Sequence, residues 1–308
     1  MASLTRRDFL RAGSFIVLGT AAAACGKGSS NTGGRKTLDQ IIHGRQQTVQ
    51  LIANDSETLS NKPERLAFAL VDPANGVVVA SATATVWVAR GQHTSALGPF
   101  TATWHDDGLG AKGIYETAIT YPADGTWDVL VELQRPGQTR TEVAVSAVQV
   151  GVQTAMPKIG DQAIRIATPT VANARGVHPI CTRKPPCSMH TISLDKALDS
   201  KKPVVLIFAT PQFCTSALCG PEVDIVQSIS KEFARDAHFI HVELYKDDKP
   251  ATIQRQLTSP AATQWKIAQE PAIYYINGTS VIVNRTIGPV DRSDVRAAAR
   301  ALITGQAG

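Results

Sequence analysis

The sequence lacks a strong charge of either sign. Its formal net charge is only +5 over 308 residues, and basic residues are spread along the chain rather than gathered in one stretch. Proteins that bind nucleic acids present a concentrated basic surface, so this charge pattern excludes a nucleic-acid partner. The sequence also contains no internal repeats, so the chain is not a repeat protein.

The N-terminal region has no apolar run long enough to be a convincing membrane-spanning helix. The apolar and small residues of 15–24 fall short of the roughly 20 that a spanning helix needs. They follow Thr5-Arg6-Arg7-Asp8-Phe9-Leu10-Arg11, which resembles a twin-arginine export signal, and they end at Ala22-Ala23-Ala24-Cys25-Gly26, which resembles a lipobox. The resemblance implies that residues 1–25 are a signal peptide and that Cys25 is lipidated. Ordinary signal-peptidase cleavage at an A-x-A site is the alternative.

Residues 26–44 are interpreted as a flexible tether, since Gly and Ser dominate their first half. A lipid-anchored protein needs such a segment to stand away from the membrane. Beyond it, a hydrophobic content of 43% is sufficient for real cores, and the length suggests two domains. If Cys25 carries lipid, four of the five cysteines remain, which predicts two pairs outside the cytoplasm with three possible connectivities.

Residues 45–150 are predicted to be all-β. Short β-branched or alternating runs are separated by turn pairs such as Asn75-Gly76, Gly98-Pro99 and Asp124-Gly125. The expected strands cover 48–52, 65–71, 77–80, 85–89, 113–120, 126–133 and 141–148. Seven strands at this spacing resemble an immunoglobulin-like sandwich, without the cysteine pair of antibody domains. The resemblance implies a spacer or a module that binds a partner.

The second predicted domain, at 181–308, follows a linker and extension at 151–180. Its apolar run 204–209 is typical of a strand buried on both faces, and apolar spacing predicts an amphipathic helix at about 220–234. The cysteines of 214 and 219 lie between them. Thiols at the carboxyl end of a strand and the start of a helix are favoured as thiolates, which predicts a redox pair rather than a structural bridge.

The elements that follow predict an α/β fold. A strand at 237–245, a weak helix at 261–268, a hairpin at 270–288 that turns at Asn277-Gly278, and a final helix capped by Ser293 complete the chain. This order resembles the thioredoxin fold, and Pro271 matches the position of the proline that opens the hairpin strand in that family. The resemblance differs in the thiol motif, which is C-x4-C here instead of W-C-x-x-C.

The resemblance implies a thiol–disulfide oxidoreductase that acts on extracytoplasmic proteins with thiols or disulfides and is anchored to the membrane by lipid. Cys214 would be the nucleophile, Cys219 the resolving thiol and Pro271 the backbone guide for substrate. No cofactor is expected. Two alternatives stay open: a thiol peroxidase similar to the Q-type peroxiredoxins, whose C-x4-C spacing is shared although Pro211 occupies the position of their threonine, and a non-enzymatic scaffold with structural disulfides.

Cys181 and Cys187 are predicted to form a structural disulfide, since they are close in the sequence and separated by Pro185-Pro186. A soft metal bound together with His178 and His190 is the alternative, although the spacing matches no standard zinc or haem pattern. The copper-delivery proteins of the Sco type need a histidine late in the domain, and none follows His241. We therefore expect no metal ligands.

Overall fold

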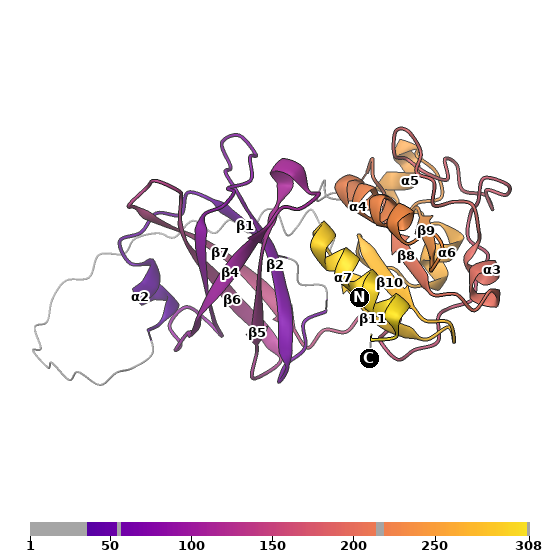
Figure 1. Cartoon of the computed structure of the whole chain (residues 1–308). Helices are drawn as coiled ribbons and strands as arrows, with labels where there is room; N and C mark the ends of the chain where they lie inside the picture. The colour runs from indigo at the N-terminus through magenta and orange to yellow at the C-terminus, as the bar shows by residue number, and fades with distance from the viewer. Residues whose placement is uncertain (1–35, 54–56, 214–218, 307–308) are drawn as a thin grey trace, which may run out of the picture. The chain divides into compact units, whose positions relative to one another are not determined.

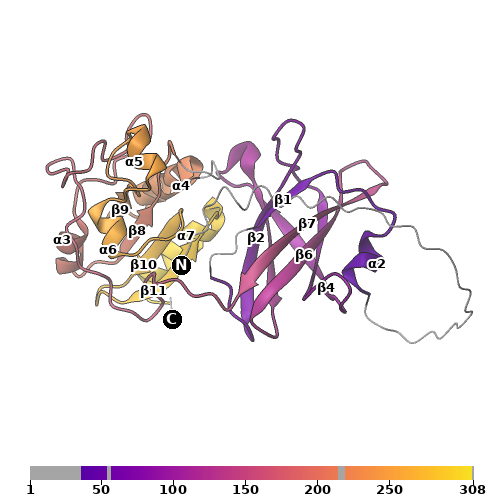
Figure 2. The same ribbon diagram turned by 180° about the vertical axis from the view of Figure 1, so that it is seen from behind.

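The structure is a computed structural model that describes residues 36–53, 57–213 and 219–306. The predictions for the signal peptide, for Cys25 and for Cys214 concern residues outside these ranges. Residues 35–308 group into one compact unit. Within it, the described residues form two sheets (Figures 1 and 2), and strands predominate over helices.

The predicted tether of residues 26–44 is too long at its C-terminal end. Helix α2 spans Leu38–Ile42 and begins with a capping box, in which the Thr37 hydroxyl accepts from the Gln40 N–H and the Gln40 side chain accepts from the Thr37 N–H. Leu38 and Ile41 are buried against Leu130 and neighbouring residues. These two apolar residues, three apart, fix the segment to the folded unit.

The first sheet has seven strands in the order β1-β2-β5-β4-β3-β6-β7, and every pairing within it is antiparallel. The strands are β1 (Gln50–Ala53), β2 (Pro63–Val71), β3 (Thr83–Ala89), β4 (Leu97–His105), β5 (Ile114–Thr120), β6 (Gly125–Gln134) and β7 (Thr141–Val150), with a short 3-10 helix, η1 (Gly110–Lys112), before β5. The sheet curls so that bridges from Gln47 to Val143 and from Thr58 to Val150 join its two ends. All seven strands contribute to one apolar core.

One of the seven predicted strands was misplaced. Residues 77–80 form no named strand, with only an isolated bridge between Val78 and Val71. The sequence interpretation missed β4 and treated Gly98-Pro99 as a turn, whereas this pair lies inside the strand. Most β4 side chains are at least partly exposed, so the strand lacks the alternation of apolar residues that reveals the others.

The second sheet has four strands in the order β11-β10-β8-β9. The strands are β8 (Val204–Phe208), β9 (His238–Val242), β10 (Ala272–Ile276) and β11 (Ile282–Ile287). Strands β8 and β9 are parallel, and the other two pairings are antiparallel. All five residues of β8 are buried, as the continuous apolar run predicted.

Helices cover both faces of this sheet (Figures 1 and 2). On one face lie α4 (Cys219–Glu232) and α7 (Arg292–Thr304), which pack on Val205, Ile207 and Phe239. On the other lie α3 (Leu194–Asp199) and α6 (Pro260–Gln264), with Trp265 packed against Phe208. This layering buries β8, an inner strand of the sheet, between the two helical layers.

Helix boundaries differ from the sequence predictions in detail. Helix α5 (Pro250–Gln254) was not predicted, and α6 ends four residues earlier than expected. Helix α7 is capped by Asp291, whose carboxylate accepts from the Asp294 N–H, and not by Ser293. Both residues are good N-caps, so only the backbone conformation decides between them.

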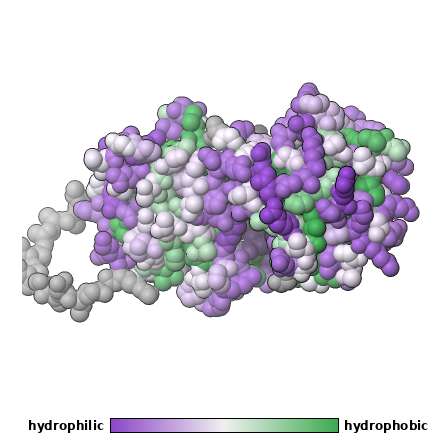
Figure 3. Space-filling view, in the orientation of Figure 1, coloured by the Kyte–Doolittle hydropathy of each residue, from purple (hydrophilic) through white to green (hydrophobic). Residues whose placement is uncertain are grey.

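Apolar side chains are scattered over the surface. On the face shown in Figure 3, hydrophilic residues predominate between separate apolar patches. The exposed large apolar residues of the described ranges are Ile52, Val77, Val152, Ile159, Val171 and Leu257. Among the described helices, none has both the length and the apolar character needed to cross a membrane.

Candidate functional site

The candidate site lies where β8 and β9 end. Because these strands are parallel, with Phe208 paired to Val242, their carboxyl ends meet at one edge of the sheet. The chain leaves β8 through Ala209 and Thr210, both fully buried, and enters helix α4 at Cys219. Open α/β sheets bind ligands and carry out chemistry at this edge.

Cys219 is the first residue of α4, completely buried and disulfide-bonded. Its partner is neither Cys181 nor Cys187, because both of these are free. Cys214, the predicted nucleophile, lies outside the described residues, so its pairing with Cys219 stays a prediction.

Pro271 directly precedes β10, and its peptide bond with Glu270 is cis. Ala272 pairs with Phe208 at the end of β8. Pro271 therefore lies beside the point where the chain leaves β8. Its role as a substrate guide stays a prediction.

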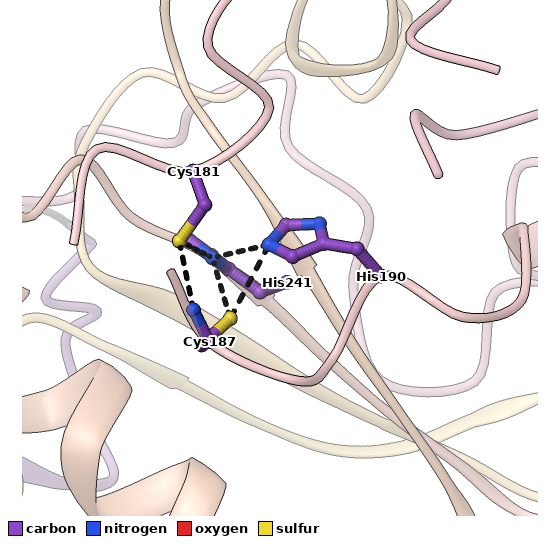
Figure 4. Close-up of side chains that lie close together, drawn as sticks. All are labelled: Cys181, Cys187, His190 and His241. Atoms are coloured by element: carbon purple, nitrogen blue, oxygen red, sulfur yellow. Dashed lines mark hydrogen bonds between the residues drawn. The ribbon is translucent and has the colours of Figure 1, made fainter. Parts of the chain in front are cut away.

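A second group of residues at this end of the sheet was not predicted as a unit. We call it the Cys–His cluster, and its side chains converge in Figure 4: Cys181, Cys187, His190 and His241. All four are buried, with exposed fractions between 0 and 6%. One potential ligand atom from each residue lies within 4.8 Å of the other three.

The sheet edge explains how the cluster is assembled. Strand β9 is the outermost strand of the sheet, so the backbone N–H and C=O groups on its open side can bond to residues 181–190. The His241 N–H donates to the Met189 carbonyl at 3.1 Å, which brings His190 beside His241 with ring centroids 5.0 Å apart. The alternation along β9 places Phe239 and His241 on the face that α4 covers.

The distances within the cluster are short. The Cys187 Sγ lies 3.2 Å from His190 Nε2 and 3.4 Å from His241 Nδ1. The Cys181 Sγ lies 3.7 Å from His241 Nδ1, and the two facing imidazole nitrogens are 3.3 Å apart. The Cys187 N–H also donates to the Cys181 Sγ at 3.3 Å.

Cys181 and Cys187 are free thiols, so the disulfide predicted between them is not formed in this structure. The alternative ligand set was also wrong in one member, because His178 is exposed and lies outside the cluster. His241 occupies the fourth position. The available signal was a histidine among the buried residues of β9, since a buried imidazole needs a polar partner.

A hydrogen-bonded chain connects the cluster with the loop after β8. The Thr182 hydroxyl donates to Glu243 Oε1 at 3.0 Å and accepts from the Gln212 N–H at 3.2 Å. The Thr182 N–H donates to the same Glu243 oxygen at 2.6 Å. The residue after Cys181 is thus bound directly to the segment that leads to Cys214.

The local environment separates the acidities of the two thiols and of the two imidazoles. The hydrogen bond between the two cysteines lowers the pKa of the Cys181 thiol, and hydrogen bonds with His190 and His241 lower it further. The same cysteine–cysteine hydrogen bond raises the pKa of the Cys187 thiol, and burial adds to that rise. Burial lowers the pKa of His190. Burial alone would also lower the pKa of His241, but Cys181 and the Glu243 carboxylate raise it above the usual value.

Two carboxyl groups stand beside these groups, one on the buried residue Glu243 and one on the partly buried residue Glu270. Burial raises the pKa of Glu243 to about 7, although His241 and Thr182 oppose the shift. Burial likewise raises the pKa of Glu270 to about 7, against hydrogen bonds from Thr210. In each carboxyl one oxygen, Oε2, is buried and has no hydrogen-bond partner among the described residues.

No protein-family model and no curated protein matches this sequence. Among solved structures, the chain is similar to a thiol:disulfide interchange protein of the thioredoxin family from Chlorobium tepidum TLS, with 13% identity and a TM-score of 0.34 over 48% of this chain and 99% of that chain. It is also similar to StoA from Bacillus subtilis, with 18% identity and a TM-score of 0.26 over 32% of this chain and 82% of that one.

A third similarity is to the PKD domain of an M14-like peptidase from a Thermoplasmatales archaeon. The identity is 11% and the TM-score 0.20, over 34% of this chain and 93% of that domain. Thioredoxin-family proteins are therefore among the structural neighbours of this chain.

Proposed function

We propose that this protein is a thiol–disulfide oxidoreductase that acts on protein partners through Cys214 and Cys219. The observation that carries the proposal is the position of Cys219. It is a disulfide-bonded residue that opens α4 after β8, with Pro271 next to the end of the same strand. Backbone N–H groups and the helix dipole at such a position stabilise a thiolate.

The arrangement of both sheets supports the domain assignment that we propose. In the order β11-β10-β8-β9, the first strand in sequence, β8, lies between its parallel neighbour β9 and the antiparallel strand β10, which forms a hairpin with β11. This is the arrangement of a thioredoxin-like domain. The order β1-β2-β5-β4, continued by β3-β6-β7, corresponds to the ABED and CFG strands of an immunoglobulin-like sandwich.

The proposed reaction is a two-electron exchange. The Cys214 thiolate attacks one sulfur of a partner disulfide, which forms a mixed disulfide and releases the other partner sulfur as a thiolate. The Cys219 thiolate then attacks Cys214, closes the protein's own disulfide and releases the second partner thiolate. The partner is reduced, the protein is oxidised, and the reverse sequence oxidises a partner dithiol. Complete burial of Cys219 suits the resolving role.

We also propose that the protein works outside the cytoplasm and is held to the membrane by lipid on Cys25. The twin-arginine-like run and the lipobox-like sequence support this assignment. Helix α2 shortens the segment between the anchor and the folded unit to about ten residues, 26–36. Partner proteins would then be exported proteins that carry thiols or disulfides.

The reduction potential of the Cys214–Cys219 couple tests the function. The full chain is equilibrated in thiol buffers of graded potential, alkylated and analysed by peptide mass spectrometry, which separates this pair from Cys181 and Cys187. A catalytic couple is expected between roughly −120 and −270 mV. A value below about −300 mV indicates a structural bond and favours the scaffold alternative.

A further inference from the structure

We propose that the Cys–His cluster binds one Zn²⁺ ion in a closed, tetrahedral, structural site. The donor set is two thiolate sulfurs and two imidazole nitrogens, which is one of the standard ligand sets of structural zinc. The four donors come from two parts of the chain, three from residues 181–190 and one from β9. The proposal does not depend on the oxidoreductase activity.

The distances between the donors fit a zinc tetrahedron. With Zn–S bonds of about 2.3 Å and Zn–N bonds of about 2.0–2.1 Å, neighbouring ligand atoms are separated by about 3.3 to 3.8 Å. The two imidazole nitrogens are 3.3 Å apart, and sulfur-to-nitrogen distances are 3.2, 3.4 and 3.7 Å. These four donor pairs differ from the tetrahedral separations by no more than a few tenths of an ångström, and all the donors lie within 4.8 Å of one another.

The second hydrogen bond of His241 directs the correct nitrogen to the ion. Its Nε2 lies 2.9 Å from the Ala209 carbonyl, which can only accept, so the proton is on Nε2 and the lone pair of Nδ1 faces the two sulfurs. Metal-binding histidines are typically oriented in this way by a backbone carbonyl. The Cys187 N–H that donates to the Cys181 sulfur is a second contact of this supporting kind.

Burial argues for an ion rather than for a hydrogen-bonded cluster alone. His190 and His241 are 1% and 0% exposed and lie ring to ring, with one nitrogen of each ring 3.3 Å from the other. The remaining nitrogen of His190, Nδ1, has no hydrogen-bond partner among the described residues. A cation between the four donors would satisfy the facing lone pairs of both rings and compensate the thiolate charge.

The same burial defines the role of the site. Four protein donors complete a tetrahedron and leave no position for water or a substrate, which distinguishes structural zinc from catalytic zinc. Residues 165–192 contain no helix and no named strand. A bound ion would therefore fasten this irregular segment to β9, much as a disulfide would.

Metal analysis of the purified full chain is the first test. We expect one zinc per chain, and in the metal-free protein Co²⁺ should give tetrahedral d–d bands with sulfur-to-cobalt charge transfer. Protein isolated without metal, with Cys181 and Cys187 joined in a disulfide, overturns the proposal. So does a Co²⁺ complex without sulfur-to-metal bands. Stoichiometric Cu⁺ in place of zinc, when both metals are supplied, overturns the assignment of the ion.

Matched variants test the ligand set. His241→Ala should reduce zinc affinity by more than the roughly 10–100-fold that follows loss of a supporting contact. His238→Ala is the control, because His238 is on the same strand but bonds to Ser200 outside the cluster. If His241→Ala does not fold, Cys187→Ser is the alternative, because it changes the side-chain volume less and should cause the same loss of zinc affinity. Undiminished zinc binding in a folded ligand variant overturns the site.

Discussion

The Thr182 hydroxyl accepts a hydrogen bond from the Gln212 backbone N–H at 3.2 Å. This contact joins the segment that carries the Cys–His cluster to the segment that leads from β8 to Cys214. Thr182 is therefore one link between residues 181–187 and the segment that follows β8. The contact of His241 Nε2 with the Ala209 carbonyl is a second.

Thr182→Val should show the value of this contact. The variant keeps the shape of the side chain but leaves the Gln212 N–H without its acceptor and removes one donor to Glu243, so we expect a loss of about 1–3 kcal/mol in the free energy of unfolding. Denaturant unfolding measures it. Thr191→Val, at an exposed position, is the control and should change stability by less than about 0.5 kcal/mol. Equal effects in both variants would contradict the structural role.

Cys219→Ser should trap a mixed disulfide on Cys214. Without a resolving thiol the first exchange step has no successor, so the adduct with a small protein disulfide accumulates. Mass spectrometry of the adduct measures the outcome, and Cys187→Ser is the matched control that should not trap a mixed disulfide.

Pro211 occupies the position of the peroxidase threonine, so hydrogen peroxide should oxidise the reduced protein more slowly than the disulfide does. The opposite order of rates would favour the peroxidase alternative.

Cys25 should be the lipid-bearing N-terminus of the mature protein. The expected result is a membrane fraction in which the first residue is Cys25 with a mass increase from acylation, and Cys25→Ser should release the protein from that fraction. Intact mass measurement and fractionation are sufficient. An unmodified N-terminus beyond Cys25 in the soluble fraction of the wild type would exclude the anchor.

Glu270→Gln should stabilise the protein in a pH-dependent way. The folded-state pKa of Glu270 is raised by burial to about 7 from the ordinary 4.5. Because the folded-state pKa is raised, the contribution of this carboxyl to the free energy of unfolding is fully present below about pH 4.5 and is lost as the pH rises through 7. Glutamine does not ionise, so the free energy of unfolding of the variant should rise by roughly 1–3 kcal/mol relative to the wild type between pH 5 and pH 8.

Unfolding curves at several pH values give this difference directly. A constant stability difference between Glu270→Gln and the wild type across this range would show that Glu270 does not titrate there.

Leu38→Ala should destabilise the first sheet. The side chain is fully buried in the small core beside Leu130, and truncation of a buried leucine costs about 2–4 kcal/mol. His43→Ala, one residue after α2 and exposed, should be neutral. If both variants unfold like the wild type, the segment behaves as the tether that the sequence predicted.

The predictable parts of this protein are those where one local pattern decides the structure. Strand β8 is a continuous apolar run, and β6 and β7 are rich in valine and threonine, so each is evident without tertiary information. Strand β4 escaped because its residues are mostly exposed and its position is fixed by pairing with β3 and β5. The sequence of one strand does not show which other strands it pairs with.

The candidate site likewise has a part that local sequence indicates and a part that depends on tertiary contacts. Cys219 and Pro271 were singled out from motif and order, and they lie at the start of α4 and directly before β10. Their roles, and the whole role of Cys214, stay predictions. The Cys–His cluster combines residues up to 60 positions apart, Cys181 and His241. Two cysteines and a histidine in a proline-rich stretch are compatible with a disulfide or a metal. Only the docking of this stretch on β9 brings His241 to it.

The packing of residues 178–190 on β9 also bears on association between copies of the protein. Strand β9 ends the sheet, four of its five residues are buried, and its His241 N–H is bonded to Met189 in this segment. An uncovered strand of this composition invites pairing with the same strand of a neighbouring molecule. The segment that carries Cys181, Cys187 and His190 thus also occupies part of an edge strand that could otherwise pair with another chain.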